Sequence, residues 1–95
     1  MLFEIRIRGL ISRMKVKILF FSLLSEIVGK DEIDFSLKSE PCTVESILDQ
    51  IYIEWPLLKD WDACMLISVD LDYVGRDVKV VDGQVIALMP PLQGG

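Results

Sequence analysis

The sequence predicts an α+β fold in which a mixed sheet of about four to five strands packs on one main helix. Three observations point to it: one long segment has apolar residues at helical spacing, several short segments alternate as strands do, and turn residues separate them. The chain has 95 residues, enough for one domain, and its hydrophobic content of 52% predicts a packed core.

The first three elements follow from local patterns. A strand begins at Lys15, and its inner face is apolar throughout while its outer face begins charged and ends apolar. Residues 22–28 predict a short helix, which Gly29 ends. Apolar and polar residues then alternate over residues 32–38, which predicts a second strand.

The main helix is predicted between Thr43 and Pro56. Thr43 suits the N-cap, Glu45 complements the positive end of the helix dipole, and Pro56 ends the helix. Apolar residues recur at i, i+3, i+4, i+7, i+8 and i+11, so they form one stripe on a single face. The members of this stripe are Val44, Ile47, Leu48, Ile51, Tyr52 and Trp55.

Two shorter strand segments follow the helix. An irregular link passes through Trp61, and residues 65–69 then alternate as a third strand. A very short segment surrounds Tyr73, and Asp82-Gly83 is a strong turn signal.

The last strand is predicted over residues 84–89. Pro90 and Pro91 stop it, because proline cannot donate to a sheet ladder. The element order is strand, strand, long helix, strand, short strand, strand. A mixed sheet wrapped over one amphipathic helix accommodates that order economically, and this is the β-grasp, or ubiquitin-like, arrangement.

The chain divides into three parts: residues 1–13, a β-grasp domain over residues 14–91, and a tail over residues 92–95. Apolar and charged residues alternate near the start, which suits an extra edge strand. A flexible extension, or an upstream start codon with Met14 as the natural start, fits the first part equally well, and the sequence leaves all three open.

Composition narrows the function classes. A net charge of −5 argues against nucleic acid and suits a basic protein partner. With no histidine and only Cys42 and Cys64, a metal site is not expected, and both thiols are interpreted as reduced apolar fillers. No apolar run reaches the ~20 residues that span a membrane, and no signal peptide is recognisable, so the cytoplasm is expected.

No catalytic constellation is recognisable either. The sequence has no Gly-rich phosphate loop and no nucleophile–base set, so a free-standing enzyme is not expected. Five carboxylates are interpreted as solvated loop residues: Asp60, Asp62, Asp70, Asp72 and Asp77.

The tail, Leu92-Gln93-Gly94-Gly95, carries the functional signal. The proline pair halts the sheet and stiffens the exit, so the tail is expected to project. Gly94 and Gly95 lack a Cβ, so a narrow channel in a partner can close around the backbone and reach the terminal carboxylate. Such a carboxylate reacts only after activation, typically as an acyl-adenylate that a thiol or persulfide attacks. The alternative is a frayed terminus with no role.

Four sequence blocks resemble the small subunits of molybdopterin synthase, the MoaD-type sulfur carriers of the ubiquitin-like group. They are KILFFS from Lys17, EIVG from Glu26, TVESIL from Thr43 and DGQVIALMPPLQGG from Asp82. The last block is the most specific, because the proline pair before the tail is typical of this family and generally absent from the related thiamine-pathway carriers. Residues 1–13 have no counterpart in the family pattern, and Asp70 stands where the family often has asparagine.

The resemblance implies a mechanism centred on Gly95. An ATP-dependent adenylating enzyme would adenylate its carboxylate, and sulfur from a persulfide donor would convert it to a thiocarboxylate. The tail would then insert into the large synthase subunit and deliver sulfur to cyclic pyranopterin monophosphate. Two carriers on a dimer of the large subunit, a heterotetramer, are the implied assembly. ATP is used by the activating enzyme, and the carrier itself holds no permanent cofactor.

An apolar docking patch is predicted on the sheet face that the main helix leaves uncovered. Scattered surface hydrophobes, or cover from residues 1–13, are the alternatives. The predicted partner-binding residues are Leu19, Phe21, Tyr73, Ala87 and Met89 on this face, and Pro90, Pro91, Leu92 and Gln93 at the tail.

Three functions remain open at this point. The first is the sulfur carrier. The second uses the same activation but ends in an amide bond to a lysine, as in a ubiquitin-like modifier, and a thiamine-pathway carrier would use the same tail. The third is a binding module with an idle tail.

Overall fold

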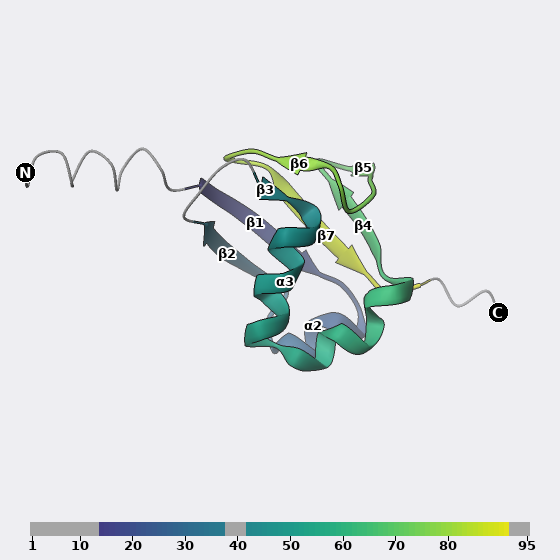
Figure 1. Cartoon of the computed structure of the whole chain (residues 1–95). Coiled ribbons are helices and arrows are strands. Elements are labelled where there is room, and N and C mark those ends of the chain that lie inside the picture. The colour runs from purple at the N-terminus through teal and green to yellow at the C-terminus, as the bar shows by residue number, and fades with distance from the viewer. Residues whose placement is uncertain (1–13, 38–41, 92–95) are drawn as a thin grey trace, which may run out of the picture.

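The computed structural model describes residues 14–37 and 42–91, and its centre is a five-stranded mixed sheet (Figure 1). The strands lie in the order β2-β1-β7-β4-β5. Their bounds are Met14–Phe20 for β1, Glu32–Leu37 for β2, Leu66–Val69 for β4, Asp72–Tyr73 for β5 and Val85–Met89 for β7.

The last strand of the described residues lies in the middle of this sheet. β7 pairs in parallel with β1, where Ile18 lies opposite Ile86, and antiparallel with β4, where Leu66 lies opposite Met89. A parallel pair between the first and last strands needs a long crossover, and the main helix lies within it. The predicted β-grasp fold is thereby confirmed.

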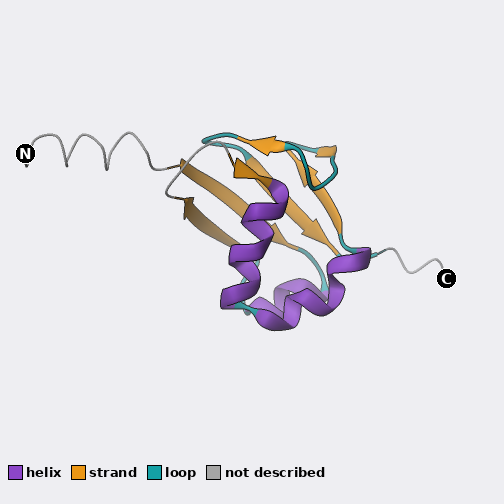
Figure 2. Ribbon diagram, in the orientation of Figure 1, coloured by secondary structure: helices purple, strands orange, loops and turns teal. Residues whose placement is uncertain are grey.

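One helix covers one face of the sheet. Figure 2 shows α3, Val44–Glu54, lying across that face, with the short α2, Leu23–Val28, below it. The predicted start of α3 is confirmed, and its N-terminus is closed by a capping box. The Ser46 N–H donates to Thr43 Oγ1, and the Thr43 N–H donates to Ser46 Oγ.

The stripe of α3 packs on the inner sheet face and forms the core. Ile47, Leu48 and Ile51 are almost fully buried against residues of β1 and β7, including Ile18 and Leu88. Trp55, which ends α3, meets Phe20 edge to face, with ring centroids 6.0 Å apart. Among the described residues, no buried side-chain polar atom lacks a hydrogen-bond partner.

The structure corrects one prediction about a connection and adds a small second sheet. The link after α3 is not irregular: a 3₁₀ segment, η1, spans Pro56–Cys64 and buries Leu58 completely. A second sheet that the sequence patterns did not indicate pairs β3, Cys42–Thr43, with β6, Lys79–Val80. Two-residue strands are too short to show a period of their own, so alternation could not predict them.

The remaining boundaries agree with the sequence to within a residue or two. α2 ends at Gly29, whose φ is +85°, a value that glycine adopts without strain. β7 begins at Val85 rather than Gln84 because Gln84 belongs to the preceding turn. No helix within residues 14–37 and 42–91 is long and apolar enough to cross a membrane. The predicted division at residues 13/14 and 91/92 involves segments outside the described part and stays a prediction.

Candidate functional site

The sheet face opposite α3 carries an apolar groove of about 540 Å³. It contains all five residues predicted for the docking patch on this face. The groove is lined by Leu19, Phe21, Ser68, Asp70, Leu71, Tyr73, Val85, Ala87 and Met89.

Strand register explains why these residues meet. Leu19 lies opposite Ala87, Ala87 lies opposite Ser68, and Ser68 lies opposite Tyr73. Residues directly opposite each other in neighbouring strands point to the same face, so these four form one row across β1, β7, β4 and β5. Ala87 and Ser68 form the buried floor in the middle of the row, and the Tyr73 side chain, 72% exposed, stands at its edge.

A second groove continues the first toward the end of β7. It shares Phe21, Tyr73 and Met89 with the first groove and adds Ser22, Leu66, Pro90 and Pro91. The Phe21 N–H donates to the Leu88 carbonyl at 3.1 Å, which holds this exposed ring beside the end of β7. The apolar surface therefore reaches Pro91, the last described residue before the tail.

Four predicted site residues, Leu92, Gln93, Gly94 and Gly95, lie outside the described residues. Their roles stay predictions. The structure describes the surface from which this segment departs, with Pro90 and Pro91 both half-buried beside it.

The far end of the groove is a tight turn between β4 and β5. Val69 pairs with Asp72, so the turn consists of Asp70 and Leu71, with φ values of 51° and 78°. Two successive positive φ values match the mirror-image turns that two-residue hairpins favour, where asparagine and glycine are usual. Aspartate tolerates this conformation, but a leucine in it costs roughly 1–2 kcal/mol.

Asp70 fastens this turn to the start of β7. Its Oδ1 accepts from the Val85 N–H at 2.9 Å, and its Oδ2 accepts from Gln84 Nε2 at 3.1 Å. Its own N–H donates to the Val85 carbonyl at 2.8 Å. Asp70 is an exposed turn residue, as the sequence suggested, and its carboxylate also acts as a structural acceptor.

Sequence reasoning missed two apolar members of the groove. Val85 lies on the same face as Ala87 and Met89 by simple alternation, so the signal for it was present. Leu71 had no comparable signal, because its position depends on a turn that lacks the usual asparagine or glycine.

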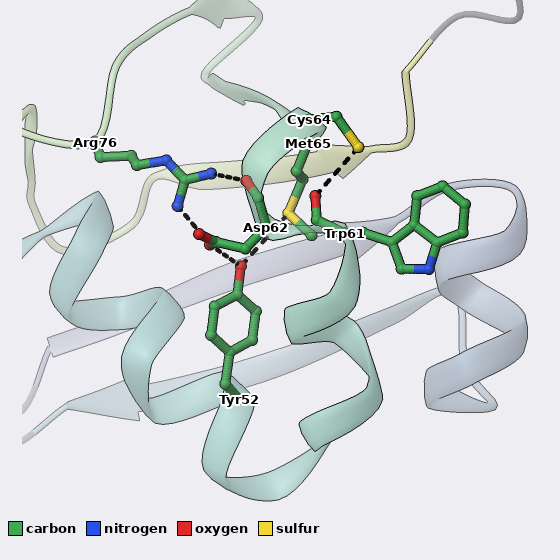
Figure 3. Close-up of polar contacts among 6 residues, drawn as sticks. All are labelled: Tyr52, Trp61, Asp62, Cys64, Met65 and Arg76. Atoms are coloured by element: carbon green, nitrogen blue, oxygen red, sulfur yellow. Dashed lines mark hydrogen bonds and ion pairs between the residues drawn. The ribbon is translucent and has the colours of Figure 1, made fainter.

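A polar cluster lies outside both grooves and joins α3, η1 and the loop before β6 (Figure 3). Asp62 Oδ1 accepts from the Tyr52 hydroxyl at 2.5 Å and from Arg76 Nη1 at 2.6 Å. Arg76 Nη2 also donates to the backbone carbonyl of Asp62. Asp62 is thus not the solvated loop carboxylate that the sequence suggested: it lies in η1 and is paired.

The pKa shifts in this cluster follow from its contacts. Burial, reinforced by the hydrogen bond to Asp62, raises the pKa of Tyr52 well above its ordinary value. Burial alone would raise the pKa of Asp62, but the hydrogen bonds from Tyr52 and Arg76 outweigh it and lower that pKa. The cluster therefore holds a neutral tyrosine beside a carboxylate–guanidinium pair, which ties three segments together.

The interpretation of both cysteines as apolar fillers holds for Cys42 and is wrong for Cys64. Cys42 is buried, whereas Cys64 is exposed and its Sγ donates to the Trp61 carbonyl at 3.6 Å. Within residues 14–37 and 42–91, no three histidine, cysteine, aspartate or glutamate side chains gather as a metal site would require.

The sequence pattern of the ThiS family matches residues 18–95. This range includes β7, which contributes to both grooves, and the terminal Gly-Gly. The chain belongs to the ThiS family. Within that family its relatives include the molybdopterin synthase sulfur carrier subunit of Caenorhabditis elegans. That protein is 35% identical over 86 residues, which cover 86% of this chain and 99% of the relative. The resemblance to MoaD-type sulfur carriers is thereby confirmed.

Two solved structures share the fold of this chain. A Pyrococcus furiosus protein described as a molybdopterin converting factor, subunit 1, is 29% identical, with a TM-score of 0.74 over 83% of this chain and 99% of that one. A chain from the complex of subunits 1 and 2 of the molybdopterin-converting factor of Helicobacter pylori is 28% identical. Its TM-score is 0.58, over 86% of this chain and 100% of that one.

Proposed function

We propose that the chain is the sulfur carrier subunit of a molybdopterin synthase and that Gly95 carries the sulfur. The observation that carries the proposal is the continuous apolar surface from the sheet face to Pro91, where the Gly-Gly tail begins. A partner that binds the tail can therefore also bind a large apolar surface next to it. The family relationship supports the chemistry at the tail itself.

Activation starts at the terminal carboxylate. An adenylating enzyme transfers AMP from ATP to this carboxylate and releases pyrophosphate. The terminal sulfur of a persulfide donor then attacks the acyl carbon and AMP leaves, which gives an acyl persulfide. A thiolate then attacks the donor's sulfur in this S–S bond and forms a disulfide with the donor, and Gly95 leaves as a thiocarboxylate. This covalent relay divides one difficult step into easier ones.

Sulfur delivery depends on the docking surface. In the Helicobacter pylori structure, subunit 1 forms a complex with subunit 2. We infer that the groove of this chain binds the large synthase subunit, so that the tail enters its active site and transfers sulfur to cyclic pyranopterin monophosphate. Two carriers on a dimer of the large subunit complete the assembly, and we place it in the cytoplasm.

Intact mass measurement tests this function directly. The chain is incubated with ATP, a persulfide donor and the adenylating enzyme from the same organism, and its C-terminal peptide is then mapped. The expected result is the mass gain of one oxygen replaced by sulfur, located at Gly95. The modified chain, mixed with the large subunit and cyclic pyranopterin monophosphate, should then form molybdopterin.

The matched control lacks only Gly94 and Gly95. Its free energy of unfolding should equal that of the full chain, because the described core ends before the tail, and it should gain no sulfur. Sulfur incorporation without Gly95 would contradict the proposal. An amide bond between Gly95 and a lysine, with no thiocarboxylate, would instead identify a ubiquitin-like modifier.

A further inference from the structure

Backbone strain in the described residues concentrates around the two grooves. Three residues other than glycine have a positive φ within residues 14–37 and 42–91: Ser22, Asp70 and Leu71. Ser22 lines the groove at the tail end, and the other two line the groove at the opposite end. Strained residues persist only when the surrounding structure holds them, and they cluster at functional sites.

Leu71 combines this strain with exposure. Its φ is 78° and its exposed fraction is 94%, the highest among the exposed large hydrophobic residues of the described chain. Packing within the chain therefore does not account for a leucine at this position. A glycine or asparagine would form the same turn without the cost, so the leucine side chain itself needs an explanation.

Register places Leu71 at the end of the face remote from the tail. β7 runs from Val85 to Met89, and the tail follows Met89 through the two prolines. Val69 lies opposite Ile86, so the turn that follows Val69 lies near the start of β7. The apolar surface thus extends the full length of β7, from the tail exit to Leu71.

We propose that Leu71 is an anchor for the large synthase subunit: a rigidly presented aliphatic side chain that inserts into an apolar pocket of that subunit. The proposal rests on the sulfur-carrier function above. In the Helicobacter pylori structure, subunit 1 forms a complex with subunit 2, and a stable subunit interface buries about 800 Å² on each partner. Only a contact that spans the whole face reaches Leu71, and this extent favours the stable partner.

Asp70 holds the turn that carries Leu71 rigid. Its side chain and backbone make three hydrogen bonds to Gln84 and Val85, so the turn cannot easily relax. A preorganised anchor loses less conformational entropy when it binds. Leu71 is therefore the source of both the backbone strain in the free chain and the affinity for the partner. Its substitution should lower the affinity without lowering the stability of the fold.

The test compares Leu71→Ala and Leu71→Gly with Ile53→Ala in the full-length chain. Ile53 is a matched control, because it is an aliphatic residue 81% exposed on α3, the layer opposite the groove. Calorimetric titration gives Kd for the large subunit, and thermal unfolding gives Tm. Both Leu71 variants should bind about tenfold more weakly or worse, while Ile53→Ala binds like the parent.

The Tm of the variants should not follow their affinity for the large subunit. Leu71→Gly removes a strained exposed side chain, so its Tm should equal or exceed that of the parent although its affinity falls. A Tm loss that parallels the affinity loss in both Leu71 variants would assign the residue to folding and overturn the proposal.

If another partner occupies the groove face, the Leu71 variants should behave differently. If the Leu71 variants bind the large subunit like the parent, the anchor proposal fails and the sulfur-carrier function stands. If they slow only adenylation, or only abolish a dimer of this chain seen in sedimentation, the face serves the activating enzyme or a second copy, and the proposal is wrong. If the parent neither binds the large subunit nor gains sulfur at Gly95, the proposed function itself fails.

Discussion

At the scale of single residues, Asp62 shows how a surface carboxylate acquires a structural role. Its two donors, Tyr52 and Arg76, come from segments on either side of it in the sequence, and each is fixed by a different element. Sequence patterns cannot reveal such a pair, because nothing local marks which of several aspartates meets an arginine 14 residues away. The carboxylate side chain is 38% exposed, so solvent screens part of its interaction with the guanidinium.

This cluster predicts how stability depends on pH. The pKa of Asp62 is lower in the folded chain than its ordinary value of 3.8, so the folded state holds the charged form more strongly than the unfolded state does. Its stabilising contribution is complete above that ordinary value and is lost as the pH falls through the folded pKa. Below a pH of about 4, the free energy of unfolding of the parent should therefore fall more steeply than that of Asp62→Asn.

Urea denaturation at a series of pH values provides the measurement. Tyr52→Phe is an informative companion, because it removes one of the two donors and keeps the carboxylate. Its pH profile should lie between the other two. Parallel profiles for the parent and Asp62→Asn would show that the cluster contributes nothing to the acid dependence.

At the scale of elements, α3 owes its position to its first turn. The reciprocal hydrogen bonds of Thr43 and Ser46 satisfy N–H groups at the helix start. The next donors are bound from outside the helix: the Val44 and Glu45 N–H groups donate to the carbonyls of Val78 and Arg76. The helix start is thus anchored to the loop that leads into β6.

Thr43→Ala tests the cap. We expect a loss of about 1 kcal/mol in the free energy of unfolding, because one helix N–H loses its acceptor. Thr43→Ser keeps the hydroxyl and should retain most of the stability, and urea denaturation of the three chains measures the difference. An equal loss in both variants would point to the β-branched methyl group, not the hydrogen bond.

The elements also show where prediction from sequence succeeds. Thr43, the stripe of α3 and Gly29 act through neighbours in the chain, and all three were predictable. The groove face followed from alternation alone, which placed Leu19, Ala87 and Met89 together. β3, β6 and the turn at Leu71 depend on long-range partners or on tolerated strain, and short-range patterns carry no trace of either.

At the scale of the whole molecule, the helix layer completes the core, and the opposite sheet face is the surface that we propose for a partner. The helix buries the inner sheet face, and the outer face keeps an apolar groove that extends across four strands. Phe21 belongs to both grooves and is 45% exposed beside the tail exit. Aromatic residues in such positions often contribute most of the affinity in an interface.

Phe21→Ala should therefore weaken binding of the large synthase subunit by about tenfold to a hundredfold, because it removes an aromatic anchor that both grooves share. Leu57→Ala is the control, since Leu57 is exposed on η1 and lines neither groove. Calorimetric titration measures both affinities, and thermal unfolding checks that the fold is intact. Equal affinities for Phe21→Ala and the parent would exclude the tail end of the face from the interface.

The central place of β7 has a mechanical consequence. The tail continues from a strand with β1 on one side and β4 on the other. A pull on the tail, such as withdrawal from a tight channel after delivery, loads this strand along its own axis, so the hydrogen bonds to both neighbours share the force and must break together. An edge strand would have such hydrogen bonds on one side only, so fewer bonds would resist the same pull. If the tail is withdrawn from one partner and passed to the next, as the proposed function requires, the pairing of β7 on both sides should keep the domain folded.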